Sequence, residues 1–370
     1  MIVFNFIFYT FLVVIVVQII YNAFIFLKFG FAKPIEQSIK KIGVSILVCA
    51  KNESDNLRRF IPEILNQNFP QFELILINDG STDDSLEVMN RFKAEHENVK
   101  VVDVKQIEAF WNNKKYALTL GIKSATYDYL LFTDADCRPV SNNWITQMSR
   151  HFTNKNSIII GYGAYKKVAN SFLNKLIRFE TVFTAMQYFS YAKIGQPYMA
   201  VGRNLAYRKD EFFNARGFMD HMQVPSGDDD LFVNQVSNTD NTAICFDPES
   251  FTESIPSNSF NDWFNQKRRH VSTAKYYRSI HKLMLGLFYI SQFLFWCCAI
   301  LLMVFMFKWK LTLGLIIVRF ILVYLSYGLS AKKLNELDTL LLLPFFELFL
   351  VLTQMVIFIS NLTSKTHHWR

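Results

Sequence analysis

The stretch YLLFTDADCRP, residues 129–139, joins an apolar run to two carboxylates that stand one residue apart. Its first four residues are apolar, as is typical of a strand buried in a sheet. Asp134 and Asp136 follow, and in an extended chain residues i and i+2 point to the same side. Two like charges held so close raise each other's pKa or recruit a cation. We therefore expect a positively charged group opposite these two carboxylates.

The sequence before this stretch alternates between strand-like and helix-like segments. Short apolar runs rich in β-branched residues predict strands at residues 44–50, 72–79 and 99–104. Segments with helix caps or with apolar residues at helical spacing follow them, at residues 51–67, 80–96 and 113–125. Strands that alternate with helices over short loops imply βαβ units and a parallel sheet. The fold class predicted for this region is therefore α/β.

Three of the four predicted strands run into polar residues: Lys51-Asn52-Glu53, Asn78-Asp79 and Asp134–Asp136. Ligands of open sheets bind beyond the carboxyl ends of the strands, so we expect these side chains to face one crevice. An aspartate at a strand end can equally cap the next turn, and for a lone residue that alternative stays open. The paired carboxylates do not have the spacing of an EF-hand loop, but they suit Mg²⁺ or Mn²⁺ that also binds substrate phosphates. A metal-bound nucleotide is the favoured occupant.

Four apolar segments long enough to cross a bilayer lie outside this region, at residues 1–28, 283–307, 311–329 and 339–359. For the first, a cleaved signal peptide is the alternative, but it fits poorly because the run is too long, has no basic start and precedes no small-residue cleavage site. The predicted organisation is therefore an N-terminal transmembrane anchor at residues 1–28, a cytosolic domain at 33–282 and about three transmembrane helices at 283–360.

Basic residues flank the predicted domain on both sides: Lys28, Lys33, Lys40 and Lys41 before it, and Lys267, Arg268, Arg269, Lys275, Arg278 and Lys282 at its end. The positive-inside rule then predicts that the domain is cytoplasmic. The net charge of +8 fits attraction to an anionic inner leaflet. The soluble part has no basic nucleic-acid-binding motif, so we expect no nucleic acid as partner. The five cysteines form no CxxC pair and are expected to be free thiols.

Six segments occur in the order seen in glycosyltransferase family 2, which this chain resembles over about residues 44–270: SILVCAKNES, ELILINDGSTDDS, NKKYALTLGI, LLFTDADCRPVSNNWI, GDDDLF and QKRRH. The resemblance implies an inverting enzyme with a GT-A fold, a Rossmann-like, mixed and mostly parallel sheet. It implies that Asp79 contacts the base and ribose of a nucleotide sugar, although the preceding residue is Asn78 where the family often has Asp. Lys114 and Asp134 would contact the nucleotide, and Asp134 and Asp136 would hold the metal.

GDDDLF, residues 227–232, resembles the element that supplies the general base in this family. An acceptor hydroxyl must lose a proton as it attacks the anomeric carbon, and a carboxylate within hydrogen-bond reach can take it. Three consecutive aspartates leave the register open between Asp228 and Asp229, with Asp228 narrowly favoured. An acidic run is also typical of a solvated loop. Here Pro225, Ser226 and Gly227 precede it and an amphipathic segment follows, which predicts a turn-to-helix junction.

QKRRH, residues 266–270, resembles the QxxRW motif, with His270 in place of Trp. The resemblance implies a helix near the membrane, where Gln266 helps to cap the donor site and Arg269 contacts the diphosphate. The alternative is a basic cluster at lipid headgroups. His270 and the small number of predicted spans favour transfer of a single sugar over processive synthesis.

Two further features concern the membrane. Residues 171–192 predict an amphipathic interface helix, because Lys175, Arg178 and Glu180 interrupt its apolar residues. Arg319 and Glu347, in separate predicted spans, could pair inside the membrane, or each could extend towards the interface.

The function expected from the sequence is transfer of a sugar from a nucleotide-diphosphate donor to a lipid or lipid-linked acceptor, with Mg²⁺ or Mn²⁺. The enzyme would lie in the bacterial inner membrane with its catalytic domain in the cytoplasm. One alternative is a catalytically degenerate scaffold subunit of a polysaccharide synthesis or export complex, and the intact aspartates argue against it. Another is a nucleotidyltransferase, which would need a Gly-rich triphosphate loop that CAKNESDN does not provide.

Overall fold

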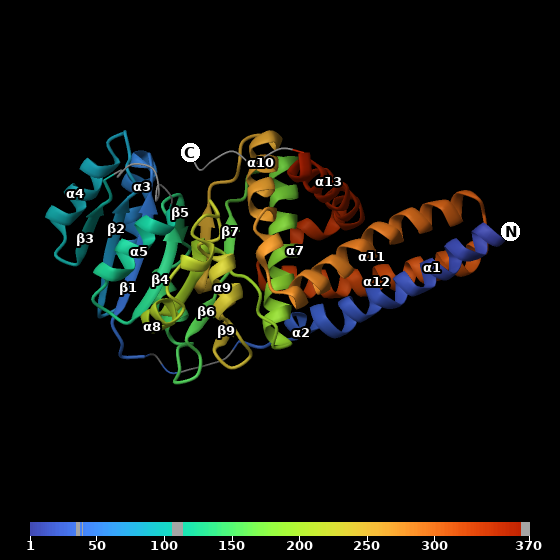
Figure 1. The fold of residues 1–370 in the computed structure, drawn as a ribbon, viewed down its shortest axis with the longest axis horizontal. Coiled ribbons are helices and arrows are strands. Elements are labelled where there is room, and N and C mark those ends of the chain that lie inside the picture. The colour runs from blue at the N-terminus through green and yellow to red at the C-terminus, as the bar shows by residue number, and fades with distance from the viewer. Residues whose placement is uncertain (35–37, 39, 106–113, 364–370) are drawn as a thin grey trace. The chain divides into compact units, whose positions relative to one another are not determined.

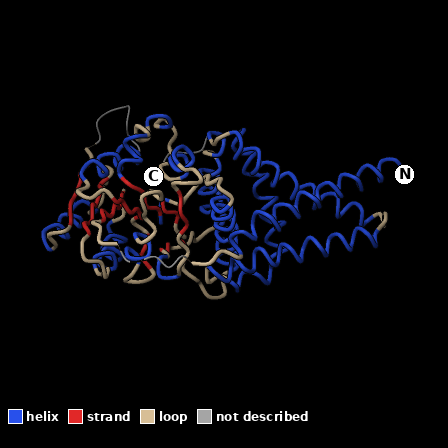
Figure 2. Tube along the Cα trace, turned by 90° about the horizontal axis from the view of Figure 1, so that it is seen from below, coloured by secondary structure: helices blue, strands red, loops and turns tan. Residues whose placement is uncertain are grey.

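The computed structural model describes residues 1–34, 38, 40–105 and 114–363, and the chain folds as two compact units. Within the described residues, the sheet unit consists of residues 34–169 and 197–258, and the helical unit consists of residues 1–33, 170–196 and 259–363. Figure 2 shows the strands in the sheet unit and the long helices in the helical unit.

The main sheet of the sheet unit has seven strands in the order β3–β2–β1–β4–β8–β6–β9. β1 pairs in parallel with β2 and β4, and β2 in parallel with β3. β8 runs antiparallel to both β4 and β6, while β9 is parallel to β6. Figure 1 shows β3, β2, β1 and β4 side by side. The strands are β1 Val44–Ala50, β2 Phe72–Asn78, β3 Val99–Asp103, β4 Tyr129–Asp134, β6 Ile158–Ile160, β8 Leu205–Arg208 and β9 Thr242–Ile244. The sheet is thus mixed and mostly parallel, as predicted.

Helices cover both faces of this sheet, which is why every residue of β1 is buried. Val44, Ile46 and Val48 pack into a core with side chains of α3 (Ser54–Leu65), α4 (Ser85–Glu95) and α6 (Trp144–Ser149). The opposite face packs against α5 (Lys114–Ser124). Gly121 of α5 lies so close to the sheet that an added Cβ would stand 2.2 Å from Cδ1 of Ile77. This close approach fixes α5, whose first residue is Lys114, against β1 and β2.

The helix predicted at residues 51–67 begins later, at Ser54, because tertiary hydrogen bonds hold the residues before it. Asn52 has a φ of 57°, and its side-chain oxygen accepts from the backbone N–H of Thr82 at 2.8 Å. The N–H of Glu53 donates to Ser85 Oγ at 2.8 Å. The loops after β1 and β2 are thereby joined at the carboxyl edge of the sheet. Residue 113, the first of the helix predicted at 113–125, lies outside the described residues.

A small second sheet, in the order β5–β10–β7, completes the sheet unit. Its strands are β5 Cys137–Pro139, β7 Gly163–Tyr165 and β10 Thr252–Ser254. β10 is antiparallel to β5 and parallel to β7. The remaining elements here are α8 Lys209–Asn214, α9 Asp230–Val236 and the 3₁₀ helices η2 Gly202–Asn204, η3 Met219–His221 and η4 Pro248–Ser250.

The helical unit contains four helical stretches that are long and apolar enough to cross a membrane: Ile2–Gly30, Ser279–Val304, Trp309–Lys333 and Leu337–Thr363. They coincide with the four predicted segments. The first consists of α1 Ile2–Ile19, the π-helix η1 Ile20–Phe26 and α2 Leu27–Gly30, and the others are α11 Ser279–Val304, α12 Trp309–Lys333 and η6 Leu337–Leu342 with α13 Leu343–Thr363. In Figure 1, α1, α11 and α12 run side by side. The unit also holds α7 Phe172–Lys193, α10 Phe260–Val271 and the 3₁₀ helix η5 Ala274–Tyr276.

Arg319 of α12 and Glu347 of α13 form an ion pair inside the helical unit. Their side chains are only 1% and 3% exposed. Gln292 donates to Glu347 Oε1 at 2.9 Å, and Arg319 donates to Gln18 Oε1 at 3.0 Å. Of the two alternatives for these charges, the structure therefore contains the pair, and its hydrogen bonds link α1, α11, α12 and α13.

The charges along α7 are also paired within the helical unit. Arg178 donates to the carboxylates of Glu336 and Asp338. Glu180 forms an ion pair with Lys267 of α10, with 2.5 Å between Oε2 and Nζ. These ion pairs attach α7 to α10 and to the segment after α12. The membrane-interface position predicted for this helix stays a prediction.

All five cysteines are free, as predicted. Cys49, Cys137 and Cys245 are buried in the sheet unit, while Cys297 and Cys298 lie on α11. Burial raises the pKa of the Cys245 thiol to about 12, so this thiol is neutral at physiological pH.

Because His151 is buried, we expect the free energy of unfolding of the sheet unit to fall at acid pH. The residue follows α6 and is 5% exposed, and burial together with nearby Arg150 lowers its pKa from 6.5 to about 4. Only the unfolded chain takes up the proton between these values, so the stabilisation is present above pH 6.5 and is lost as the pH falls towards 4. We expect His151→Gln to remove about 3 kcal/mol of the pH dependence of unfolding between pH 7 and 4. Chemical unfolding at several pH values measures this slope, and equal slopes for both proteins would refute it.

Candidate active site

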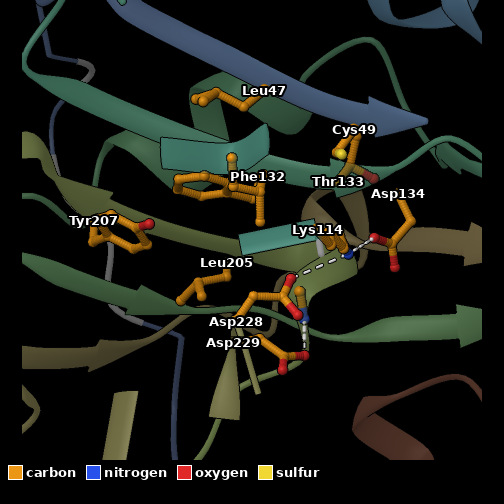
Figure 3. A pocket seen from close by; sticks show the side chains of 12 residues that line it. Leu47, Cys49, Lys114, Phe132, Thr133, Asp134, Leu205, Tyr207, Asp228 and Asp229 are labelled. Carbon is orange, nitrogen blue, oxygen red and sulfur yellow. Dashed lines mark hydrogen bonds and ion pairs between the residues drawn. The ribbon is translucent and has the colours of Figure 1, made fainter. Parts of the chain in front are cut away.

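Lys114 is the positive group opposite Asp134, one of the two carboxylates of the opening stretch, and it also pairs with Asp228. Its Nζ lies 2.8 Å from Oδ1 of Asp134 and 3.1 Å from Oδ2 of Asp228. Figure 3 shows the ammonium group between these two carboxylates. Burial by itself would lower the pKa of Lys114, but Asp134 and Asp228 outweigh it and raise the pKa well above its usual value. The lysine is therefore a fixed positive charge.

Three separate parts of the chain meet at this lysine. Asp134 is the last residue of β4, Lys114 the first of α5, and Asp228 stands shortly before α9. Gly227 has a φ of 94°, a conformation that favours glycine and that turns the chain directly before Asp228. The three groups lie at one end of a pocket with a largely apolar wall, lined among others by Leu47, Leu118, Phe132, Leu205 and Tyr207.

Asp134 and Asp136 form a potential metal site together with Cys137. One ligand atom from each of the three residues lies within 4.8 Å of those of the others. Burial and the charge of Asp134 raise the pKa of Asp136. The Cys137 thiol is hydrogen-bonded to Asp136 Oδ1 at 3.3 Å, and burial raises its pKa well above its usual value, so it stays a neutral thiol. The two carboxylates are thus the donors suited to Mg²⁺ or Mn²⁺.

Asp79 follows β2 directly and is 5% exposed. Burial raises its pKa, while the positive charges of Lys51 and Lys114 act in the opposite direction. Asn78 beside it has a structural role. Its Nδ2 donates to Asp103 at 2.7 Å, and its Oδ1 accepts from the backbone N–H of Ser81 at 3.1 Å. The amide at position 78 therefore ties β2 to β3 and holds the turn after Asp79.

Asp228 and Asp229 have different surroundings. Both oxygens of Asp229 accept backbone hydrogen bonds, from Gly202 at 2.7 Å and from Asp230 at 2.7 Å, and the residue caps the start of α9. Burial and the neighbouring charges of Asp228 and Asp230 raise the pKa of Asp229 to about 7. Asp228 instead directs its carboxylate towards Lys114.

Gln266 and Arg269 lie on α10, in the helical unit. They are three residues apart and so share one face of the helix. Between them, Lys267 pairs with Glu180, and Arg268 donates to Asn361 Oδ1 at 3.1 Å, which attaches α10 to α7 and α13. The donor-site roles expected for Gln266 and Arg269 stay predictions, whereas Asp134, Asp136, Lys114, Asp228 and Asp229 all belong to the sheet unit.

The contact of Arg203 with the Asp136 region was not predicted from the sequence. This arginine follows Gly202 on η2, and its guanidinium stacks over the ring of Tyr165 at 4.3 Å. It also donates to Ser254 at 3.3 Å, and its charge lowers the pKa of Asp136. Arg203 therefore supplies positive charge next to Asp136, the partly buried carboxylate of the potential metal site. No regular spacing connects residue 203 with residue 136, so only the folded chain reveals the contact.

Part of the sheet unit is similar to known proteins. Residues 45–213 match the sequence profile of glycosyl transferase family 2. Poly-β-1,6-N-acetyl-D-glucosamine synthase of Staphylococcus epidermidis is 37% identical over 94 residues, which are 25% of this chain and 22% of that protein. The synthase of the same name from Staphylococcus aureus strain MSSA476 is 35% identical over 94 residues. The match thus spans about a fifth of the length of these relatives.

The fold has a counterpart among solved structures. The mannosyltransferase PcManGT from Pyrobaculum calidifontis, solved in complex with GDP-Man and Mn²⁺, superposes with a TM-score of 0.56 at 14% identity. The superposition covers 89% of this chain and 97% of that one. The predicted architecture, a GT-A-like α/β domain plus four candidate membrane-spanning helices, is confirmed.

Proposed function

Because residues 45–213 form a glycosyl transferase family 2 domain, we propose that this protein transfers a sugar, with inversion, from a nucleotide-diphosphate sugar to a lipid-linked or glycan acceptor. The observation that carries the proposal is the position of Lys114 between Asp134 and Asp228. One carboxylate belongs to the metal motif and the other to the motif that supplies the base. The reaction needs two events, departure of the diphosphate and deprotonation of the acceptor. The ammonium group of Lys114 contacts a carboxylate from the motif for each of them.

On the donor side, Asp79 would contact the base and ribose, and Asp134 and Asp136 would hold Mg²⁺ or Mn²⁺. When bound, the metal supplies positive charge that stabilises the departing diphosphate. Lys114 adds a preorganised ammonium group at the same end of the pocket. The complex of PcManGT with GDP-Man and Mn²⁺ supports a metal-bound nucleotide sugar as the ligand of this fold. Gln266 and Arg269 of α10 assist in binding the donor.

On the acceptor side, Asp228 is the general base. Asp228 and Asp229 both line the pocket, but both oxygens of Asp229 accept hydrogen bonds from backbone N–H groups. Asp228 takes the proton of the acceptor hydroxyl as the oxygen attacks the anomeric carbon from the side opposite the diphosphate, which inverts that carbon. Lys114 holds the carboxylate of Asp228 in place, with its Nζ 3.1 Å from Oδ2. Asp229 attaches the start of α9 to Gly202 and so orders the backbone next to the base.

The helical unit and the relatives support the proposed acceptor and cellular location. Four apolar helices and their basic flanks support a protein of the bacterial plasma membrane whose sheet unit is cytoplasmic. The relatives are named as synthases of an N-acetylglucosamine polymer, so nucleotide-activated N-acetylglucosamine is the first donor to test. His270 in place of the usual tryptophan supports transfer of one sugar per acceptor.

Sealed membrane vesicles test metal dependence and orientation together. We expect inverted vesicles that contain the protein to release nucleoside diphosphate when UDP-N-acetylglucosamine, GDP-mannose or a related donor is added outside. Right-side-out vesicles should release none. EDTA should abolish the release, because two carboxylates without the metal leave the diphosphate charge uncompensated, and added Mn²⁺ or Mg²⁺ should restore it. Vesicles with Asp136→Asn are the matched control. Turnover that resists EDTA, or that needs right-side-out vesicles, would contradict the proposal.

A further inference from the structure

A second lysine, next to Lys114 on α5, contacts the segment that carries the proposed base. Lys115 is 1% exposed, and its Nζ donates to the backbone oxygens of His221 at 2.7 Å and Val224 at 3.0 Å. We propose that Lys115 is a positioning residue that holds residues 219–227 against α5 and thereby fixes the carboxylate of Asp228. The inference rests on the proposed role of Asp228 as the base.

Lys115 places a buried ammonium group between a helix and a loop, a position that an apolar side chain could also occupy. Burial of an ammonium group is unfavourable unless its donors are satisfied, and an apolar side chain would pack at such a position without this penalty. Hydrogen bonds from a charged donor are stronger than those between neutral groups. The hydrogen bonds of its ammonium group to the carbonyls of His221 and Val224 therefore explain the lysine at position 115 better than packing does.

The segment that it holds has little regular structure. After η3 ends at His221, the chain reaches α9 at Asp230 through turns. The His221 carbonyl also accepts from the backbone N–H of Val224 at 3.0 Å, so Lys115 binds both carbonyls of one tight turn. Asp228 is only four residues beyond Val224, and Gly227, with its φ of 94°, lies between them.

Helix α5 thus holds the base in two ways. Lys114 binds the carboxylate of Asp228 directly, while Lys115 binds the backbone that leads to it. Because α5 packs closely on β2 and β1 at Gly121, both contacts attach the segment with the base to the sheet whose β4 carries the metal motif. Burial lowers the pKa of Lys115 to about 8, and the charges of Asp228, Asp229 and Asp230 oppose this, so the ammonium form predominates at neutral pH.

Kinetics of Lys115→Met, which keeps the side-chain length and removes the donors, test the proposal. We expect kcat to fall by a factor on the order of 10 to 100, since displacement of a reacting group by about 1 Å has effects of that size. The KM of the donor should change less than twofold, roughly, because the donor contacts at Asp79 and Asp134 are untouched. Lys115→Arg retains charged donors and should recover part of the lost kcat. Lys123→Met, at an exposed position of the same helix, is the control and should behave as the wild type.

Hydrogen exchange separates this inference from the proposed function. Lys115→Met should speed exchange of residues 219–230 and leave β1 and β4 protected, which also shows that the variant is folded. Unchanged exchange in that segment, or faster exchange with unchanged kcat, would overturn the positioning role. Equal losses in Lys115→Met and Lys123→Met would also overturn it. A wild type that is inert with every donor would reject the proposed function, and exchange alone would then decide whether Lys115 orders the segment.

Discussion

Asp228→Asn lowers kcat by a factor on the order of 10² to 10⁴ if Asp228 is the general base, because an amide cannot accept the proton of the acceptor hydroxyl. The KM of the donor should change little. Lys114 keeps its contact with Asp134 in the variant, and the carboxylates that hold the metal are not altered. Steady-state rates of diphosphate release over a range of donor concentrations separate the two parameters.

Asp229→Asn is the matched control, since it makes the same change one residue further along. Both oxygens of Asp229 accept backbone N–H groups, and an amide can replace only one of these acceptors. We expect a loss of about 1–3 kcal/mol of folding stability with a smaller effect on kcat. The opposite pattern, with turnover abolished in Asp229→Asn and retained in Asp228→Asn, would assign the base to Asp229.

Arg319→Met should destabilise the helical unit by about 3–5 kcal/mol, because it leaves Glu347 as an unpaired charge in an apolar interior. Glu347→Met should have a similar effect on Arg319. The double variant should lose much less than the sum of the two, since it removes both charges and leaves only apolar side chains. Unfolding in mixed micelles gives the three free energies.

The exposed Lys310→Met, which lies on the same helix α12, is the control for this double-mutant cycle. Its effect should stay within about 1 kcal/mol, because the position is exposed and its ammonium group makes a cation–π contact with the ring of Trp309 at 5.7 Å. Additive losses from Arg319→Met and Glu347→Met would mean that the two charges do not stabilise each other, contrary to the ion pair.

The sequence predicted the half of the sheet unit that contains long, regular elements. β1 to β4 are apolar runs of five to seven residues, and polar residues mark the carboxyl edge where Asp79 and Asp134 lie. The strands β6, β7, β9 and β10 have three residues each, which is too short for a pattern of alternating burial to be recognised. The antiparallel β8 and the second sheet therefore became visible only in the structure.

The site could be predicted from the sequence only in part, because it depends on contacts between distant parts of the chain. Resemblance suggested that Lys114 lies near a nucleotide, but its bridge to Asp228, 114 residues further on (228 − 114), depends on how α5 packs on the sheet. The tripeptide Asp228–Asp230 has three identical side chains, so only backbone geometry distinguishes their surroundings. Likewise, NKKYAL does not reveal which lysine faces the carboxylates and which one faces the loop. For Arg319 and Glu347, pairing depends on the rotation of two helices about their axes, which composition does not determine.

Release of nucleoside diphosphate by the purified full-length protein, measured for the wild type beside Asp136→Asn, tests most directly whether this site transfers sugars. With Mn²⁺ or Mg²⁺ and a panel of nucleotide sugars, we predict turnover by the wild type with at least one donor, with the sugar recovered in a glycosylated product. Asp136→Asn should reduce that turnover by a factor on the order of 100 or more, because the metal that stabilises the leaving diphosphate loses a ligand. Wild type and variant that are equally inert with every donor, or equally active with one, would contradict the assignment.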